Sequence, residues 1–242
     1  MIQILRKSCV MLGVIGWSIL CALIMTGLAA VGQTIRARSI MPVWGKGVLL
    51  CFGTRFSVTG QEYLPSGNFI AAVSHHSLLD TFIYPAILPP ETCYIAKSEL
   101  SRLPIFSRAF RLMGNIFVRR GEGMVALSEL IRHVQSLPPH HTVFIHPEGT
   151  RGSEGSARPL KPGIVYLACE TQKSVVPIVS LGGNRMWPKG VSLPDPGHIS
   201  IHVGEPIMTD TWQIDTVEIH LEEVVNGLDD LFARTSKSGS SN

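Results

Sequence analysis

The 242-residue chain lacks the patterns that usually hold disulfides, structural zinc or a hydrolase nucleophile. Its five cysteines are scattered, and no two of them form a C-x-x-C pair. An odd number of isolated thiols argues against a disulfide framework and fits buried cysteines in a reducing compartment. The chain also contains no H-E-x-x-H and no G-x-S-x-G sequence. These absences argue against a zinc-hydrolase helix and a serine nucleophile elbow.

A strong excess of either charge is also missing. Lysine and arginine total 21 against 18 aspartates and glutamates, which leaves a formal net charge of +3. Nucleic-acid-binding domains present a concentrated basic face, so no nucleic-acid partner is predicted. A small positive excess is compatible with an anionic membrane surface or an anionic substrate.

One long uncharged stretch is present near the N-terminus, with an apolar centre at residues 10–31. About 20 apolar residues suffice to cross a bilayer as a helix, so this stretch predicts a membrane anchor. A cleaved signal peptide is the alternative, because Leu28-Ala29-Ala30 offers small residues for cleavage. Arg36 and Arg38 follow the apolar run, which favours the cytoplasm for the side that carries the rest of the chain.

A second apolar piece, residues 47–52, is too short to span a bilayer. It could lie in the interface or return the chain to the same side, so a full span and a monotopic hairpin both remain open. We therefore assign residues 1–58 to an anchor with interfacial helices and residues 59–234 to one folded domain. Residues 235–242 are rich in Ser, Gly and Lys and are expected to form a flexible tail.

From about residue 61 onward, short β-like runs alternate with helical ones. The expected strands are residues 68–74, 93–96, 115–118, 142–146, 175–180 and 198–203. The expected helices are residues 80–87, 103–112, 124–137 and 162–170, with a final helix after Asp215. This alternation predicts an α/β domain with a largely parallel or mixed sheet. Pro177 within an apolar strand predicts an edge strand or a bulge.

Polar side chains concentrate between the first expected strand and the helix that follows it, in residues 74–80. Neutral imidazole can accept a proton near physiological pH, and a carboxylate can hold its tautomer, which makes His75 and Asp80 a candidate base and its partner. On one helix, residues five apart would face about 140° apart, so His75 must lie in a loop. Ser77 and Asp80 have capping-box spacing, and a helix cap with two incidental histidines is the alternative.

Three later segments bring cations to strand ends. They are Lys97, the pair Arg119-Arg120, and the loop Pro147-Glu148-Gly149-Thr150-Arg151. Ligands of α/β sheets bind at the carboxyl ends of strands, and Lys and Arg suit a phosphate there. Taken singly, each could be solvated surface charge, and Glu148 and Arg151 could simply pair within a turn.

In this order, these segments together with Val176-Pro177-Ile178 resemble the glycerolipid acyltransferase family, and in particular its bacterial 1-acyl-glycerol-3-phosphate acyltransferases. The resemblance covers roughly residues 61–204. It implies a single mixed-sheet acyltransferase domain behind the anchor. It also favours His75 over His76, because His75 stands five residues before Asp80.

The resemblance implies transfer of a fatty acyl group from acyl-CoA or acyl carrier protein to the free hydroxyl of lysophosphatidate, on the bacterial inner membrane and facing the cytoplasm. His75 would be the general base and Asp80 its partner, with no acyl-enzyme, no metal and no cofactor. The positions that would bind the acceptor and its phosphate are Lys97, Arg120, Glu148, Gly149, Thr150 and Arg151.

Two departures from the family pattern bear on the acceptor. Ser74 stands where Asn usually precedes the histidine, and His146 stands where Phe usually precedes Pro-Glu-Gly. Another lysolipid acceptor, such as lyso-ornithine lipid, is therefore the runner-up. A metal site, which would suit a membrane-bound hydrolase, and a non-catalytic lipid-binding protein are the hypotheses from other classes. The metal site would draw on His75, His76, His140, His141 and His146.

Overall fold

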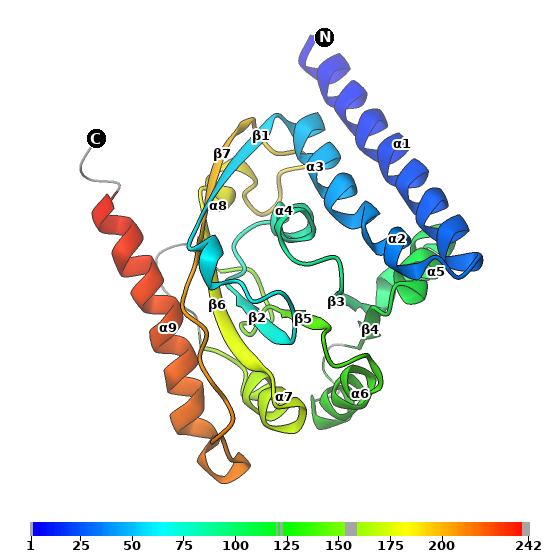
Figure 1. Ribbon diagram of the computed structural model, residues 1–242. Coiled ribbons are helices and arrows are strands. Elements are labelled where there is room, and N and C mark those ends of the chain that lie inside the picture. Colours follow the sequence, from blue (N-terminus) through cyan, green and yellow to red (C-terminus); the bar gives the residue numbers. More distant parts are fainter. Residues whose placement is uncertain (1, 120, 122, 153–158, 239–242) are drawn as a thin grey trace.

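The computed structural model describes residues 2–119, 121, 123–152 and 159–238. Its centre is one sheet of seven strands in the order β1-β7-β6-β2-β5-β3-β4, with helices on both faces (Figure 1). The strands are β1 (Thr54–Thr59), β2 (Phe69–Val73), β3 (Thr92–Lys97), β4 (Ile116–Val118), β5 (Thr142–Ile145), β6 (Ser174–Leu181) and β7 (Gly197–Val203). All neighbouring pairs are parallel except β6 with β7, so the predicted mixed α/β sheet is confirmed.

The helices are α1 (Ile2–Ala30), α2 (Thr34–Arg38), α3 (Ile40–Phe52), α4 (Asp80–Ile87), α5 (Pro104–Leu112), α6 (Gly123–Ser136), α7 (Gly163–Thr171), α8 (Gly183–Met186) and α9 (Val217–Ser238). Short 3₁₀ turns lie at Gln61–Tyr63, Ser98–Arg102 and Ile214–Thr216. The strands and helices expected between residues 68 and 203 match within one residue at each end.

The N-terminal helices form a hairpin in which α1 and α3 lie side by side, joined through α2 (Figure 1). Two tryptophan hydrogen bonds join α1 to α3, and we call them the Trp17–Trp44 clasp. The Trp17 indole N–H donates to the Trp44 carbonyl at 3.1 Å, and the Trp44 indole N–H donates to Ser18 Oγ at 3.0 Å. α1 also contacts α5, and α3 contacts α4. The hairpin therefore packs against the α/β domain.

Apolar side chains build one core on each face of the sheet. β2 shows why: all five residues are buried, and Phe69, Ala71 and Val73 point into the core under α3 and α4. Ile70 and Ala72 point into the opposite core under α7 and α9. Successive side chains of a strand face opposite sides, so a strand with a continuous apolar run needs helices on both faces.

Two local expectations differ from the structure. All residues of β1 except Thr59 fall in the 1–58 segment assigned to the anchor, yet β1 pairs in parallel with β7 over its whole length. Pro177 lies in β6, which has neighbours on both sides, so the edge-strand alternative is wrong. The bulge alternative holds, because Val175 pairs with Ile207 whereas Ile178 pairs with Val203, which leaves one extra residue opposite Pro177.

Candidate active site

Four parallel strands bring the candidate residues to one edge of the sheet. β2, β5, β3 and β4 are neighbours in that order and run in the same direction. His75 follows the end of β2 and His146 follows the end of β5. Lys97 is the last residue of β3, and Arg119 comes directly after β4. The carboxyl edge of the sheet is therefore where the polar segments meet, as strand-end ligand sites require.

The Asp80 carboxylate organises the loop between β2 and α4. Its Oδ2 accepts hydrogen bonds from His75 Nδ1–H at 3.0 Å, from the His76 N–H at 3.1 Å and from the Ser77 N–H at 3.0 Å. Its Oδ1 accepts one from the Ser180 hydroxyl at 3.2 Å. The Leu79 N–H donates back to Ser77 Oγ at 3.2 Å. The bond from the Ser77 N–H to Asp80 is one half of the predicted capping box. The other half is missing, because α4 begins only at Asp80, its N-cap residue is Leu79, and no side chain caps it. His75 therefore lies in the loop before the helix.

Asp80 is 1% exposed, and its charge state follows from these bonds. Burial alone would raise its pKa, but the His75 hydrogen bond, the two nearby imidazoles and the Ser77 N–H outweigh it and lower the pKa. Asp80 is therefore a carboxylate that holds the proton of His75 on Nδ1. The unprotonated Nε2 of His75 is then the atom that can accept a proton.

The two histidines of this loop, His75 and His76, lie in different surroundings. His76 is 2% exposed, and its ring meets the edge of Phe232 on α9 at a centroid distance of 5.6 Å. The His75 side chain keeps 15% exposure beside Asp80. Only His75 combines a carboxylate partner with access from outside, which agrees with the choice made from spacing.

The loop after β5 holds the backbone of His75 from the other side. The His75 N–H donates to Glu148 Oε1 at 3.3 Å, and the Gly152 N–H donates to the His75 carbonyl at 2.8 Å. Glu148 is itself buried. Gly149 turns the loop at a φ of +71°, where a residue with a side chain would be strained. The loop therefore fixes the segment from which His75 projects.

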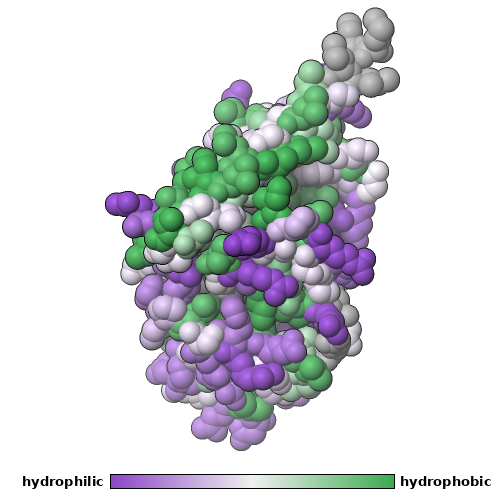
Figure 2. Space-filling view, turned by 90° about the vertical axis from the view of Figure 1, so that its right-hand side faces the viewer, coloured by the Kyte–Doolittle hydropathy of each residue, from purple (hydrophilic) through white to green (hydrophobic). Residues whose placement is uncertain are grey.

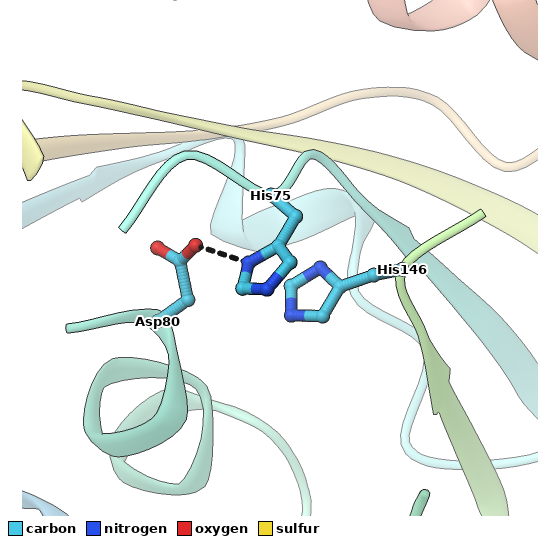
Figure 3. Close-up of side chains that lie close together, drawn as sticks. All are labelled: His75, Asp80 and His146. Carbon is cyan, nitrogen blue, oxygen red and sulfur yellow. Dashed lines mark hydrogen bonds and ion pairs between the residues drawn. The ribbon is translucent and has the colours of Figure 1, made fainter. Parts of the chain in front are cut away.

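His146 lies flat against His75 (Figure 3). The ring centroids are 3.9 Å apart and the planes differ by 16°. His146 Nδ1–H donates to the Val73 carbonyl at 2.9 Å. Burial, followed by the neighbouring His75, lowers the pKa of His146 to about 3. His146 is therefore a neutral ring at physiological pH.

Two of the five histidines of the metal hypothesis lie close to Asp80. His75, Asp80 and His146 each offer a ligand atom, and these atoms lie within 4.8 Å of one another. Both Asp80 oxygens are already engaged, and His146 Nδ1 is bonded to a carbonyl. His141 instead contacts Arg38 and does not join this group.

A cavity of about 460 Å³ opens beside His146. Its walls are mostly apolar, with Phe144 and Leu130 among them, and its basic members are Lys97, Arg119 and Lys161. Cavities of this size hold small-molecule ligands. The cavity joins a hydrophobic interior to cationic side chains next to the histidine pair.

A family model described as Acyltransferase matches residues 55–181, slightly more than half of the chain. The chain belongs to the acyltransferase family. The match begins inside β1 and ends at the last residue of β6, so it contains both histidines, Asp80 and every member of the cavity wall.

Relatives of this acyltransferase come from plants, animals and bacteria. The 1-acyl-sn-glycerol-3-phosphate acyltransferase of Cocos nucifera is 27% identical over 77% of this chain and 60% of its own length. The alpha form from Homo sapiens is 28% identical over 93% of this chain and 80% of its own. That of Borreliella burgdorferi is 28% identical over 62% and 61%. The chain thus spans about three-fifths of the length of the plant relative.

The fold has a solved counterpart. The crystal structure of the 1-acyl-sn-glycerophosphate acyltransferase from Thermotoga maritima superposes with a TM-score of 0.71. The superposition covers 93% of this chain and 97% of that chain, at 24% sequence identity. At this identity the likeness concerns the fold.

The acyltransferase brings only some of the expected site residues together. His75, Asp80 and Glu148 share hydrogen bonds, whereas Lys97 and Gly149 line the cavity. Thr150 is exposed and Arg151 half-buried in the same loop, and neither lines the cavity wall. Arg120 lies outside the described residues.

The roles of three residues at the site were not predicted from the sequence. Ser180 bonds Asp80, and the available signal was a lone hydroxyl near the end of the apolar strand β6. His146 was noted as a departure from the family pattern and as one of five histidines of the metal hypothesis, and neither gave it a contact with His75. Lys161 lines the cavity, and its place directly before Pro162-Gly163 gave no hint of that.

Proposed function

We propose that this acyltransferase moves a fatty acyl group from an acyl thioester to the free hydroxyl of lysophosphatidate, making phosphatidate. The observation that carries the proposal is the His75–Asp80 pair, whose Nδ1 and Oδ2 atoms are 3.0 Å apart. His75 stacks on His146, which lines a cavity with apolar walls and basic side chains. An anionic lipid with one acyl chain has that combination of properties. The named relatives support the same reaction.

The chemistry needs only a base and two aligned substrates. His75 Nε2 takes the proton of the acceptor hydroxyl as its oxygen attacks the thioester carbonyl. The tetrahedral intermediate then expels the thiolate, which recovers the proton from the His75 imidazolium. Asp80 stabilises that imidazolium through the Nδ1–H bond. General-base assistance contributes roughly 10²–10⁴-fold, and alignment of the two substrates supplies the remainder.

Basic side chains would bind the acceptor phosphate. Lys97, Arg119 and Lys161 line the cavity next to His146, and ammonium and guanidinium groups bind phosphate through charge-assisted hydrogen bonds. Arg151 and Arg120 are assigned the same role, with Gly149 and Thr150 contributing backbone and hydroxyl groups. Glu148 would act indirectly, by holding the backbone of the base, because its carboxylate accepts a hydrogen bond from the His75 N–H.

The N-terminal helices would hold the enzyme on the membrane that supplies the acceptor. The stretch Arg6–Ala30 is long and apolar enough to cross a bilayer, and only 17% of its apolar window is buried. Figure 2 shows an apolar upper half around the N-terminal helices and a hydrophilic lower half. The Trp17–Trp44 clasp supports retention of α1 over cleavage as a signal peptide. We assign the protein to the bacterial inner membrane, with the domain facing the cytoplasm.

The test is an acceptor panel with purified protein in mixed micelles. Lysophosphatidate, glycerol-3-phosphate, lyso-ornithine lipid and lysophosphatidylcholine are each offered with labelled acyl-CoA or acyl carrier protein. Lysophosphatidate should give the highest kcat/KM. Transfer to lyso-ornithine lipid alone would establish the runner-up, and transfer to none would refute the acyltransferase assignment of the site.

A further inference from the structure

We propose that His146 is a positioning residue for the base: its ring fixes the plane of the His75 imidazole and so aims Nε2 at the acceptor hydroxyl. This inference rests on the proposed function, in which His75 is the base. It gives a role to the residue that departs from the family pattern at this position.

Two contacts together orient the His75 ring. The Asp80 bond holds Nδ1, but one hydrogen bond leaves the ring free to swing about that contact. His146 removes this freedom, because its ring lies at 3.9 Å and 16° from that of His75 (Figure 3). With Nδ1 held and one face covered, the direction of Nε2 is set. The His75 side chain still retains 15% exposure, which a substrate needs to reach it.

His146 is the more firmly held of the two rings. Its Nδ1–H is bonded to the carbonyl of Val73, the last residue of β2. The edge of Phe144 meets it at 4.7 Å and 79°, and Tyr84 meets it at 6.3 Å and 75°. His146 thus joins the ends of β2 and β5 and offers His75 a rigid wall.

Charge is compatible with this role throughout the reaction. Among the described residues, the titratable groups that contact His146 or act on its charge are His75, His76, Asp80 and Tyr84. Burial and then the neighbouring His75 keep His146 neutral by lowering its pKa to about 3. Burial and then Asp80 keep the Tyr84 phenol neutral by raising its pKa. A neutral ring can lie against the His75 imidazolium that forms in the reaction, whereas a second cation would repel it.

Three substitutions distinguish the contribution of the His146 ring from that of its hydrogen bond to the Val73 carbonyl. His146→Phe keeps a planar ring and loses the bond to Val73. His146→Gln can keep a donor for that carbonyl and loses the ring, and His146→Leu loses both. If stacking positions the base, wild type and His146→Phe should have similar kcat values, and both should exceed those of His146→Gln and His146→Leu. A role in anchoring the loop would instead favour His146→Gln over His146→Phe.

The measurements are kcat, acceptor KM and the pH profile of kcat/KM, with thermal unfolding as a check on folding. Misplacing a reacting group can cost up to about 10²-fold, so we expect His146→Leu and His146→Gln to lower kcat by about tenfold or more. Acceptor KM should stay within about twofold, because His146 orients the base without holding the phosphate. The acidic limb of the pH profile should move in these two variants and stay in place in His146→Phe.

A second measurement does not depend on activity. In histidine-labelled protein, the His75 ring resonances of wild type and His146→Phe should show the ring-current shift of a stacked neighbour, and those of His146→Gln should lose it. Equal kcat and equal pH profiles for His146→Gln and His146→Phe would overturn the inference. If instead His75→Ala retained full activity, the proposed base would be wrong, and the inference would be overturned with it.

Discussion

α1 and β2 are both apolar in sequence, and they place their side chains in opposite surroundings. Leu12 and Leu23 of α1 are 70% and 55% exposed, whereas every residue of β2 is buried. Soluble domains rarely expose a contiguous apolar patch of this kind, and large ones mark membrane or protein contacts. Composition alone therefore does not reveal where an apolar segment lies. Among the residues that the structure describes, the outer face of α1 stays exposed, and we propose lipid as its partner.

The same contrast holds for polar groups. The stretch of α1 from Ser8 to its end carries no charge, and its proposed solvent would be lipid. The domain buries charged groups and satisfies them internally, as Asp80 does with four hydrogen bonds. One region would thus depend on the bilayer and the other on its own hydrogen bonds. Substitutions in either should leave the other's property unchanged.

The largest expected effect is on chemistry. His75→Ala removes the base and should lower kcat by about 10²–10⁴-fold, while vesicle binding stays at the wild-type level. His198→Ala, at an exposed histidine on β7, is the matched control and should keep wild-type kcat. The measurements are initial rates with lysophosphatidate and co-sedimentation with anionic vesicles. Activity of His75→Ala within threefold of wild type would exclude it as the base.

The next effect is on membrane attachment. Replacing the exposed Leu12, Leu20 and Leu23 of α1 by Ser removes apolar surface worth about 1.5–3 kcal/mol for each buried side chain. Vesicle partitioning should fall by at least about tenfold, and kcat in mixed micelles should stay close to wild type. The control replaces Met208 and Ile219, two exposed apolar residues of the domain, by Ser. Equal partitioning of the two sets of variants would mean that α1 does not anchor the protein.

Sequence reasoning worked where the information is local. The succession of short apolar runs and helical patterns located the strands from β2 to β7 and the helices α4, α5, α6 and α7, because such a pattern reports burial within one segment. It did not predict the short helix α8. It missed β1, whose partner β7 lies about 140 residues further along the chain. The residue pattern also left open whether the sheet was parallel or mixed, because the direction of neighbouring strands depends on tertiary packing. The mixed sheet was implied by the family resemblance.

The site divides in the same way. His75 and Asp80 are five residues apart, so their partnership could be inferred from spacing. The stacking of His146 and the hydroxyl of Ser180 come from β5 and β6, whose positions beside β2 only the folded sheet determines. Interactions between distant strands are therefore what the structure added.

A moderate effect is expected on acceptor binding. Lys97→Gln removes one ammonium from the cavity wall, and a hydrogen bond to a charged group is worth about 1.5–3 kcal/mol. Acceptor KM should rise by about tenfold or more, with acyl-donor KM and vesicle binding unchanged. Arg102→Gln, at an exposed cation outside the cavity wall, should leave all three values as they were. A rise confined to donor KM would instead place Lys97 at the thioester.

The smallest effect is on stability in acid. Burial is the main cause that lowers the pKa of His146 to about 3 and that of His141 to about 4. Both stay neutral in the folded protein while the unfolded chain takes up protons below about pH 6.5. Between about pH 6.5 and 4 the unfolded state therefore binds more protons than the folded state. The free energy of unfolding decreases as the pH is lowered through this range. Asp80, whose pKa is lowered, adds a loss only below about pH 4.

When the pH is lowered from 7.5 to 5, each of these two histidines can reduce the free energy of unfolding by at most about 2 kcal/mol. The unfolding temperature measured in detergent should drop over that range. In His146→Phe the drop should be smaller, because one titrating group is gone. The Leu12, Leu20 and Leu23 serine variant should show the full wild-type drop, since both histidines lie in the domain. An equal drop in His146→Phe and wild type would show that His146 titrates alike in both states and does not contribute to the acid sensitivity.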